Sequence, residues 1–402
     1  YATIVAIVVA MAAVGFNEGI FLGILLACFF FILLYSRRPA LRKTYTASVV
    51  RSTVRRLYSQ RRFLDDVCRQ IQVMRLQGFM FFGSINGVEA SIRGLLEQHQ
   101  WRDNPIRFLV LDFALVSGMD FSAAEAFIRI RRLLEAREIY MIICGAERVA
   151  EVGRALRAAG VWSNAASEYV QTSPSLNEAL EWCENVLLQH YYLHQAALGG
   201  AEVPQSYAIV TAPQPSEAAY GTSPRHAMVT MATQSAMPAR APDPPATAAG
   251  HPALPLLHQA FLNPESPHPI NGPLAFIAPH FVRRQLRPGQ RLWHAGAAPI
   301  GMYVVESGTL RVYVEGGAVD SGPEAVESIL PGTSLGELAL VTNQSHCTTV
   351  VADGAVALWE LPKTTYDELS ASDPAGVLAF VRLALINSAQ GLEAITAYCF
   401  CR

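Results

Sequence analysis

The chain has 402 residues, a net charge of −2 and 51% hydrophobic residues. A nearly neutral chain carries no electrostatic footprint for nucleic acid, so no nucleic-acid partner is expected. The seven cysteines follow no zinc or disulfide spacing, which favours reduced thiols and predicts no metal site. They are Cys28, Cys68, Cys144, Cys183, Cys347, Cys399 and Cys401.

Two apolar runs open the chain, over residues 2–15 and 20–35, with Asn17, Glu18 and Gly19 between them. Each run is shorter than the roughly 20 residues of a helix that spans a bilayer. We expect residues 1–36 to be the last helices of a membrane domain, as two short or tilted helices or as one kinked helix. Glu18 is interpreted as an interfacial turn residue, with an intramembrane acid as the alternative.

A basic stretch follows the second apolar run, and the next acidic residue after that run is Asp65. Such a stretch beside a membrane helix stays on the cytoplasmic side and can attract anionic lipid headgroups. Residues 37–62 are therefore predicted to be a basic juxtamembrane linker with membrane lipid as partner, and the rest of the chain to be cytosolic. The basic residues are Arg37, Arg38, Arg42, Lys43, Arg51, Arg55, Arg56, Arg61 and Arg62.

Residues 63–195 alternate strand and helix patterns, and the continuously apolar run 108–111 is typical of a strand covered on both faces. This alternation predicts an α/β layer domain. The expected strands are 71–76, 79–82, 107–112 and 140–144, and the expected helices are 88–99, 122–137, 147–159 and 175–190.

Residues 196–273 are rich in Ala, Pro, Ser, Gly and Thr, which predicts a disordered linker with one apolar island at 254–262 that could be a docking helix. From residue 274, short strand patterns alternate with glycine turns, which is typical of a β-barrel or jelly roll. Its expected strands are 291–294, 302–305, 310–314, 328–330, 348–351 and 355–361, before helices that begin after residue 362.

Residues 335–347 carry a glycine-led motif, Leu335-Gly336-Glu337-Leu338-Ala339, and then, after a spacer, Ser345-His346-Cys347. The glycine would let the backbone approach a phosphate closely, and the amides of residues 336–338 would face an anion at a helix start. This motif resembles the phosphate cassette of cyclic-nucleotide-binding domains. The resemblance covers residues 274–402 and implies a cyclic nucleotide as ligand.

In that family a glutamate at the position of Glu337 holds a ribose hydroxyl, and the resemblance implies this role here. His346 stands where the family has arginine, and Cys347 where it has a small alanine. Because histidine is mostly neutral at pH 7 and cannot grip a phosphate bidentately, we predict weak or absent binding of cyclic nucleotide. The possible ligand-binding residues are Gly336, Glu337, Leu338, His346 and Cys347.

The strand 108–113 is followed by Val116-Ser117-Gly118-Met119-Asp120 and then by a helix pattern that starts with Phe121 and Ser122. This arrangement resembles the STAS domain, in which a buried strand leads to a regulatory loop. Phe121 replaces the serine that is phosphorylated in the family's anti-sigma-factor antagonists, and Ser122 keeps a hydroxyl one place later. Asp120 and Ser122 are candidate regulatory residues, and the alternative is that either one caps the helix.

The order of apolar helices, basic stretch, STAS domain and cyclic-nucleotide-binding-like domain resembles the C-terminal part of sulfate-permease-like (SulP-type) transporters of the fungal vacuolar branch. The resemblance implies a multidomain fold of membrane helices, an α/β domain and a jelly-roll-like β-roll with flanking helices. It also implies an integral membrane protein of the vacuolar membrane whose membrane core transports anions such as sulfate, a dimer through the membrane and STAS regions, and a regulatory role for this part. The sequence contains no catalytic motif, so we expect no enzymatic activity. A membrane-tethered cyclic-nucleotide sensor and a protein-interaction scaffold are the alternatives.

Overall fold

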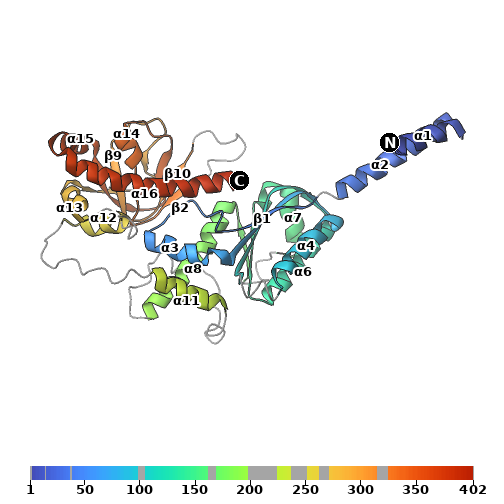
Figure 1. Ribbon diagram of the computed structural model, residues 1–402, viewed down its shortest axis with the longest axis horizontal. Coiled ribbons are helices and arrows are strands. Elements are labelled where there is room, and N and C mark those ends of the chain that lie inside the picture. Colours follow the sequence, from blue (N-terminus) through green and yellow to red (C-terminus); the bar gives the residue numbers. More distant parts are fainter. Residues whose placement is uncertain are drawn as a thin grey trace. The chain divides into compact units, whose positions relative to one another are not determined.

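The computed structural model describes residues 2–13, 15–36, 39–97, 105–161, 169–197, 224–236, 251–261, 271–314 and 325–401. The chain divides into two compact units (Figure 1). The first unit contains residues 1–45 and 71–179, and the second contains residues 46–70 and 180–402.

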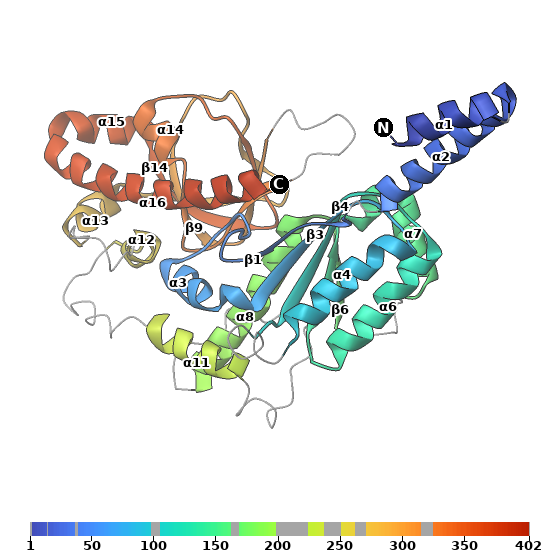
Figure 2. The same cartoon turned by 45° about the vertical axis from the view of Figure 1, so that its right-hand side comes forward.

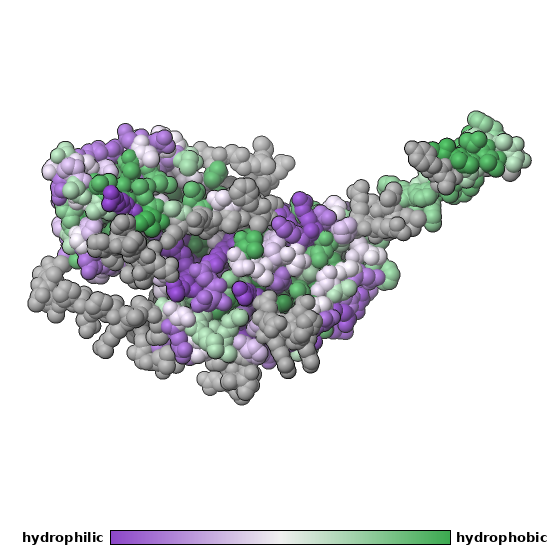
Figure 3. Space-filling model, in the orientation of Figure 1, coloured by the Kyte–Doolittle hydropathy of each residue, from purple (hydrophilic) through white to green (hydrophobic). Residues whose placement is uncertain are grey.

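The chain begins with two helices, α1 (Ala2–Ala13) and α2 (Phe16–Ser36), which pack against each other. Gly19 permits this approach, because a Cβ at that position would lie 3.0 Å from the Cα of Met11. The structure thus has two helices, and the alternative of a single kinked helix is wrong. The predicted break at residues 17–19 is also wrong, because α2 begins at Phe16 and Glu18 lies in its first turn and not between the helices. Apolar side chains cover their outer surface (Figure 3), as with Phe21 and Leu25, which are 70% and 67% exposed.

Within the described ranges, none of the helices combines the length and the apolar character that crossing a membrane requires. The membrane helices therefore remain a prediction.

A five-stranded sheet of order β1-β3-β4-β5-β6 forms the centre of the first unit. Strands β3 to β6 pair in parallel, and helices α4, α6 and α7 follow them along the chain (Figure 2). The bounds are β1 Leu41–Thr46, β3 Ile71–Met80, α4 Phe82–Leu95, β4 Phe108–Met119, α6 Phe121–Glu135, β5 Tyr140–Cys144, α7 Ala150–Ala158 and β6 Val170–Ser173, with 3₁₀ turns η1 Cys68–Gln70 and η2 Ala146–Arg148.

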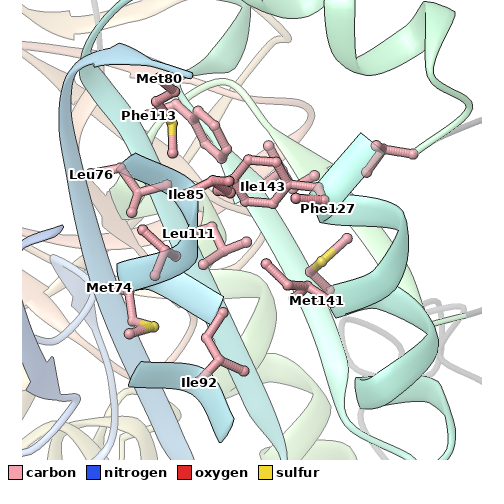
Figure 4. Close-up of a cluster of buried hydrophobic side chains, with 14 of the residues drawn as sticks. Met74, Leu76, Met80, Ile85, Ile92, Leu111, Phe113, Phe127, Met141 and Ile143 are labelled. Carbon is pink, nitrogen blue, oxygen red and sulfur yellow. The ribbon is translucent and has the colours of Figure 1, made fainter. Parts of the chain in front are cut away.

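Large apolar side chains from the sheet and its helices fill the core of this unit (Figure 4). Leu111 and Ile143 come from neighbouring strands, and Phe127 of α6 packs with Phe113 of β4 at a ring-centroid distance of 5.4 Å. The predicted α/β layer domain is present. The two expected strands 71–76 and 79–82 are one long strand, because β3 continues through irregular pairing around Gly78.

The second unit contains two sheets, of order β2-β11-β10-β13-β8 and β12-β9-β14-β7. Every strand predicted after residue 274 is found, and β7 and β12 are additional. The bounds are β2 Val54–Arg55, β7 Val282–Leu286, β8 Arg291–Trp293, β9 Gly301–Ser307, β10 Leu310–Tyr313, β11 Ala325–Ile329, β12 Ser334–Leu335, β13 Thr349–Ala352 and β14 Val356–Pro362. Apolar residues such as Tyr303, Leu310 and Leu358 close the space between the sheets.

Helices flank this β-roll, and two of them fall in the stretch predicted to be disordered. They are α11 (Pro224–Ala236) and α12 (Leu254–Phe261), which forms at the apolar island and buries Leu257 and Phe261 against the last helix. The docking helix predicted at 254–262 is confirmed as α12, whereas the prediction of disorder is wrong for α11, whose apolar residues such as Val229 are buried. The remainder, apart from a few described residues at its edges, lies outside the described residues. The other helices are α3 Tyr58–Val67, α8 Leu176–Ala197, α13 Asn271–Ile277, η3 Ala278–His280, α14 Glu337–Thr342, α15 Lys363–Ser372 and α16 Pro374–Cys401.

The predicted basic linker 37–62 is largely folded, which corrects the sequence interpretation. Its first part forms β1 at the edge of the first unit's sheet, so the α/β domain begins before residue 63. Its later part supplies β2 and the start of α3 to the second unit. The positive charges of Arg55 and Arg56 are paired with buried glutamates, which is why a stretch so basic can be part of a folded unit.

Candidate ligand site at the cassette

The cassette begins at a glycine that no other residue could replace without strain. Gly336 has φ of +86°, and a Cβ there would lie 3.1 Å from the carbonyl oxygen of Gly301. The glycine connects β12 to the six-residue helix α14, whose Leu340 amide donates to the Gly336 carbonyl at 3.0 Å. Leu338 points away from the core and is 46% exposed.

Glu337, the predicted ribose-binding residue, is buried and surrounded by groups of the chain itself. Only 2% of the residue is exposed. The Ser334 hydroxyl donates to its Oε1, and Asn387 of α16 donates to that hydroxyl at 2.8 Å. The Glu337 Oε2 atom lies 3.9 Å from Nη1 of Arg55. The carboxylate is therefore held by a serine and a cation from within the protein.

Arg55 comes from β2 and reaches the cassette from the opposite end of the sequence. Its Nε donates to Oε1 of Glu327 at 2.6 Å, and its Nη1 donates to the carbonyl oxygen of Ser334 at 2.8 Å. Burial lowers the pKa of this guanidinium, but Glu327 and Glu337 raise it further, and the net shift is upward. Arg55 thus stays charged and balances two carboxylates.

His346 does not take the place of a phosphate-binding arginine. Its ring stacks on the indole of Trp293, with centroids 4.0 Å apart and an angle of 12° between the planes. Burial lowers the pKa of the imidazole, and among the described atoms its Nε2 has no hydrogen-bond partner. The neighbouring Cys347 is exposed. The predicted site residues 336–338 lie together at the start of α14. His346 brings no positive charge to them, because its imidazole is neutral at pH 7 and packs as an aromatic ring against Trp293.

A small cavity of about 40 Å³ lies beside Arg55. It is lined by residues 53–57 and Arg61, by Glu327 and the turn at Gly332, and by Asn387 and Gly391 of α16. A cavity of this volume holds a few water-sized groups but not a nucleotide. Glu337 does not line this cavity, and its own carboxylate is buried.

The second predicted site lies at the carboxyl end of β4, in the first unit. Asp120 caps α6, since its Oδ1 accepts from the Ala123 amide at 2.6 Å, and Ser122 is exposed. Three exposed aromatic rings lie near the ends of β3 and β4: Phe79 lies near the end of β3, Phe82 follows β3 and Phe121 follows β4. The capping interpretation of Asp120 is confirmed, and a regulatory role for Ser122 stays a prediction.

Sequence reasoning missed Arg55, Glu327 and Trp293. Arg55 was counted as one of nine basic linker residues, and a two-residue strand leaves almost no signal in a sequence. A β-branched pair, Thr53-Val54, directly before the arginine is the only local hint.

Two family models match the chain, the STAS domain over residues 64–179 and the cyclic nucleotide-binding domain over residues 283–373. The chain has a STAS domain followed by a cyclic nucleotide-binding domain. Both domains were predicted from the sequence, and both predictions are confirmed.

The chain is also similar to the vacuolar basic amino acid transporter VSB1 of Saccharomyces cerevisiae, with 37% identity over 195 residues, or 48% of this chain. The chain spans only 18% of the length of that relative. The cAMP-dependent protein kinase regulatory subunit of Mycosarcoma maydis is 40% identical over 80 residues, which are 18% of this chain and 15% of that protein. The two domain matches and the similarity to the yeast vacuolar transporter confirm the resemblance predicted from the sequence.

Among solved structures, a cyclic nucleotide-binding domain from Methylobacillus flagellatus aligns over 37% of this chain and 82% of that chain. Its identity is 14% and its TM-score is 0.31.

Proposed function

We propose that this chain is the C-terminal regulatory part of a vacuolar membrane transporter. The observation that carries the proposal is the 37% identity to a vacuolar transporter over 195 residues. The name of that relative gives basic amino acids, rather than sulfate, as its cargo, and we extend this cargo class to the protein that contains this chain. In this proposal a membrane core transports the solute, and the two cytosolic domains regulate or assemble it without any enzymatic step.

The STAS domain is the proposed contact for dimerisation or for a regulatory protein. Support comes from Phe82 and Phe121, which are 64% and 57% exposed beside Asp120, where burial against a partner would remove apolar area from water. Arg42 and Lys43 are exposed residues of the basic stretch and are the proposed contacts for anionic lipid headgroups.

A chimera tests the transport proposal. The matched region of the yeast relative is replaced by this chain, and uptake of radiolabelled arginine and sulfate is measured in vacuoles isolated from cells that lack the native transporter. We expect the chimera to take up arginine but not sulfate. Its rate of arginine uptake should differ from that of the yeast transporter with the matched region deleted. Equal rates with and without the region, at equal protein levels, would refute a regulatory role.

A cyclic-nucleotide sensor is the second candidate, favoured by the match of residues 283–373 to that family. Calorimetric titration of cyclic AMP and cyclic GMP into the 402-residue chain, with His346→Arg beside it, tests this candidate. We expect no micromolar binding by the unmutated chain, because the cassette has no arginine at position 346 and Glu337 is already bonded. Micromolar binding would establish the sensor and refute that expectation.

A further inference from the structure

The guanidinium of Arg55 lies where three parts of the cyclic nucleotide-binding domain meet. Glu327 of β11 accepts from its Nε, the Ser334 carbonyl of β12 accepts from its Nη1, and Glu337 of α14 lies 3.9 Å away. Helix α16 covers it, since a Cβ at Gly391 would lie 3.7 to 3.9 Å from three guanidinium atoms. The Arg55 side chain is only 24% exposed, so the protein surrounds it much as a binding site surrounds a ligand.

The backbone around Arg55 delivers this side chain in a fixed position. Val54 and Arg55 pair in parallel with Ser328 and Ile329, adding a strand to the edge of β11. On the preceding side, the Thr53 hydroxyl donates to the Val326 carbonyl. On the following side, Arg56 donates to Glu184 at 3.0 Å. Because both neighbours are held, little conformational entropy is lost when the guanidinium enters the site.

The charges of the site favour a planar cation over a phosphate. Glu327 and Glu337 expose only 7% and 3% of their side chains, and buried carboxylates require a cation nearby. A guanidinium has donors spread around a plane and can satisfy a carboxylate and a carbonyl at once. The neutral, stacked His346 offers no positive charge to an anion.

We propose that the cassette of this domain is a guanidinium site and that Arg55 of the same chain is its resident ligand. This inference goes beyond the proposed function and does not depend on transport. The segment that carries Arg55 joins β1 to β3 of the STAS domain in the sequence. Arginine and other small guanidinium compounds form the class of ligand that would compete with Arg55.

Chemical rescue of an emptied site tests the proposal in the purified 402-residue chain. Arg55→Ala removes the resident and should lower the melting temperature of the cyclic nucleotide-binding domain by about 5–10 °C. Guanidinium chloride or L-arginine, each at about 20 mM, should recover at least half of that loss, whereas L-lysine and sodium chloride should not. None of these additives should stabilise the unmutated chain, because its site is filled.

Two further variants make the result specific. Arg61→Ala is the matched control, because Arg61 lines the same cavity but its Nε has no hydrogen-bond partner among the described residues, and no rescue is expected for it. Adding Glu337→Gln to Arg55→Ala should abolish the rescue. If Arg55→Ala does not fold alone, it is prepared in about 20 mM guanidinium chloride, and the β11 amide protons of residues 328 and 329 should exchange at least tenfold faster once the guanidinium is removed.

Three outcomes would overturn the proposal. The first is a rescue that L-lysine or sodium chloride reproduces, and the second is the absence of any rescue in a folded Arg55→Ala chain. The third is stabilisation of Arg55→Ala by cyclic AMP at the same concentration, which would show that the emptied site accepts an anion. Uptake by the chimeric transporter is a separate measurement, so failure of one proposal is distinguishable from failure of the other.

Discussion

Removal of the negative charge of Glu184 should strongly destabilise the second unit. This carboxylate on α8 accepts from the Ser52 amide at 2.9 Å, from the Ser52 hydroxyl at 2.5 Å and from Nε of Arg56 at 3.0 Å, and its Oε2 also lies 3.0 Å from Nη2 of Arg56. Both partners are buried, with 5% of the Glu184 side chain and 2% of the Arg56 side chain exposed. Glu184 thereby holds the strand-forming segment in place.

In Glu184→Gln the side-chain oxygen of the glutamine can still accept from the backbone N–H of Ser52. The NH₂ group of the glutamine, however, faces Arg56 and the Ser52 hydroxyl, and it cannot accept from either. The variant loses the bond from Nε of Arg56 and the negative charge that lies 3.0 Å from this buried guanidinium. Breaking one side of a buried ion pair costs about 3–5 kcal/mol. That loss is a large part of the roughly 5–15 kcal/mol by which a domain is stable.

Urea unfolding followed by tryptophan fluorescence measures this loss, since Trp182 lies two residues before Glu184 in α8. The urea concentration at the midpoint of unfolding should fall, with little change in the slope of the unfolding free energy against urea concentration. Glu181→Gln is the matched control on the same helix, because Glu181 is 3.8 Å from Arg311 and is partly exposed, and its cost should stay below about 1 kcal/mol. If Glu184→Gln also costs less than about 1 kcal/mol, the carboxylate does not hold the segment.

The other predictions concern the cassette and the STAS loop. Asp120→Ala should cost about 1 kcal/mol of unfolding free energy through the lost helix cap, whereas Ser122→Ala should cost almost nothing, as urea titration of both variants would show. Gly336→Ala should cost at least about 1–2 kcal/mol, because alanine at φ of +86° is strained and its Cβ meets the Gly301 carbonyl; an unchanged midpoint would contradict this. Burial lowers the folded-state pKa of His346, so the unfolded chain binds this proton more readily and stability is lost as the pH falls below about 6.5. In His346→Phe the melting temperature should fall less between pH 7 and pH 5 than in the unmutated chain. An equal fall in both would show that a lowered pKa of His346 does not cause it.

The strands of the β-roll could be predicted because each is a short apolar run between glycine turns, as with 302–305 and 355–361. The predicted bounds fail where pairing extends beyond the apolar run. Strand β4 continues to Met119 because its later residues pair with β3, which no pattern in residues 113–119 indicates.

The cassette likewise contains one feature that the sequence reveals and one contact that it does not. A left-handed glycine before a glutamate can be recognised locally, because only the backbone conformation of Gly336 is required. The partner of that glutamate cannot be recognised in this way. Arg55 and Glu337 are 282 residues apart in the chain, and nothing near either residue specifies the other.

The sequence by itself determined the order of the domains, the class of each domain and the glycine at the start of the cassette, because these depend on local periodicity and turn chemistry. Tertiary structure alone decided that part of the basic stretch folds with the β-roll and that its arginine pairs with Glu327. It also decided that His346 packs against Trp293 as an aromatic ring. These outcomes depend on the pairing of a two-residue strand and on the burial of side chains against partners that are distant in the sequence. Such contacts stabilise the fold only when remote segments meet, so no local pattern indicates them.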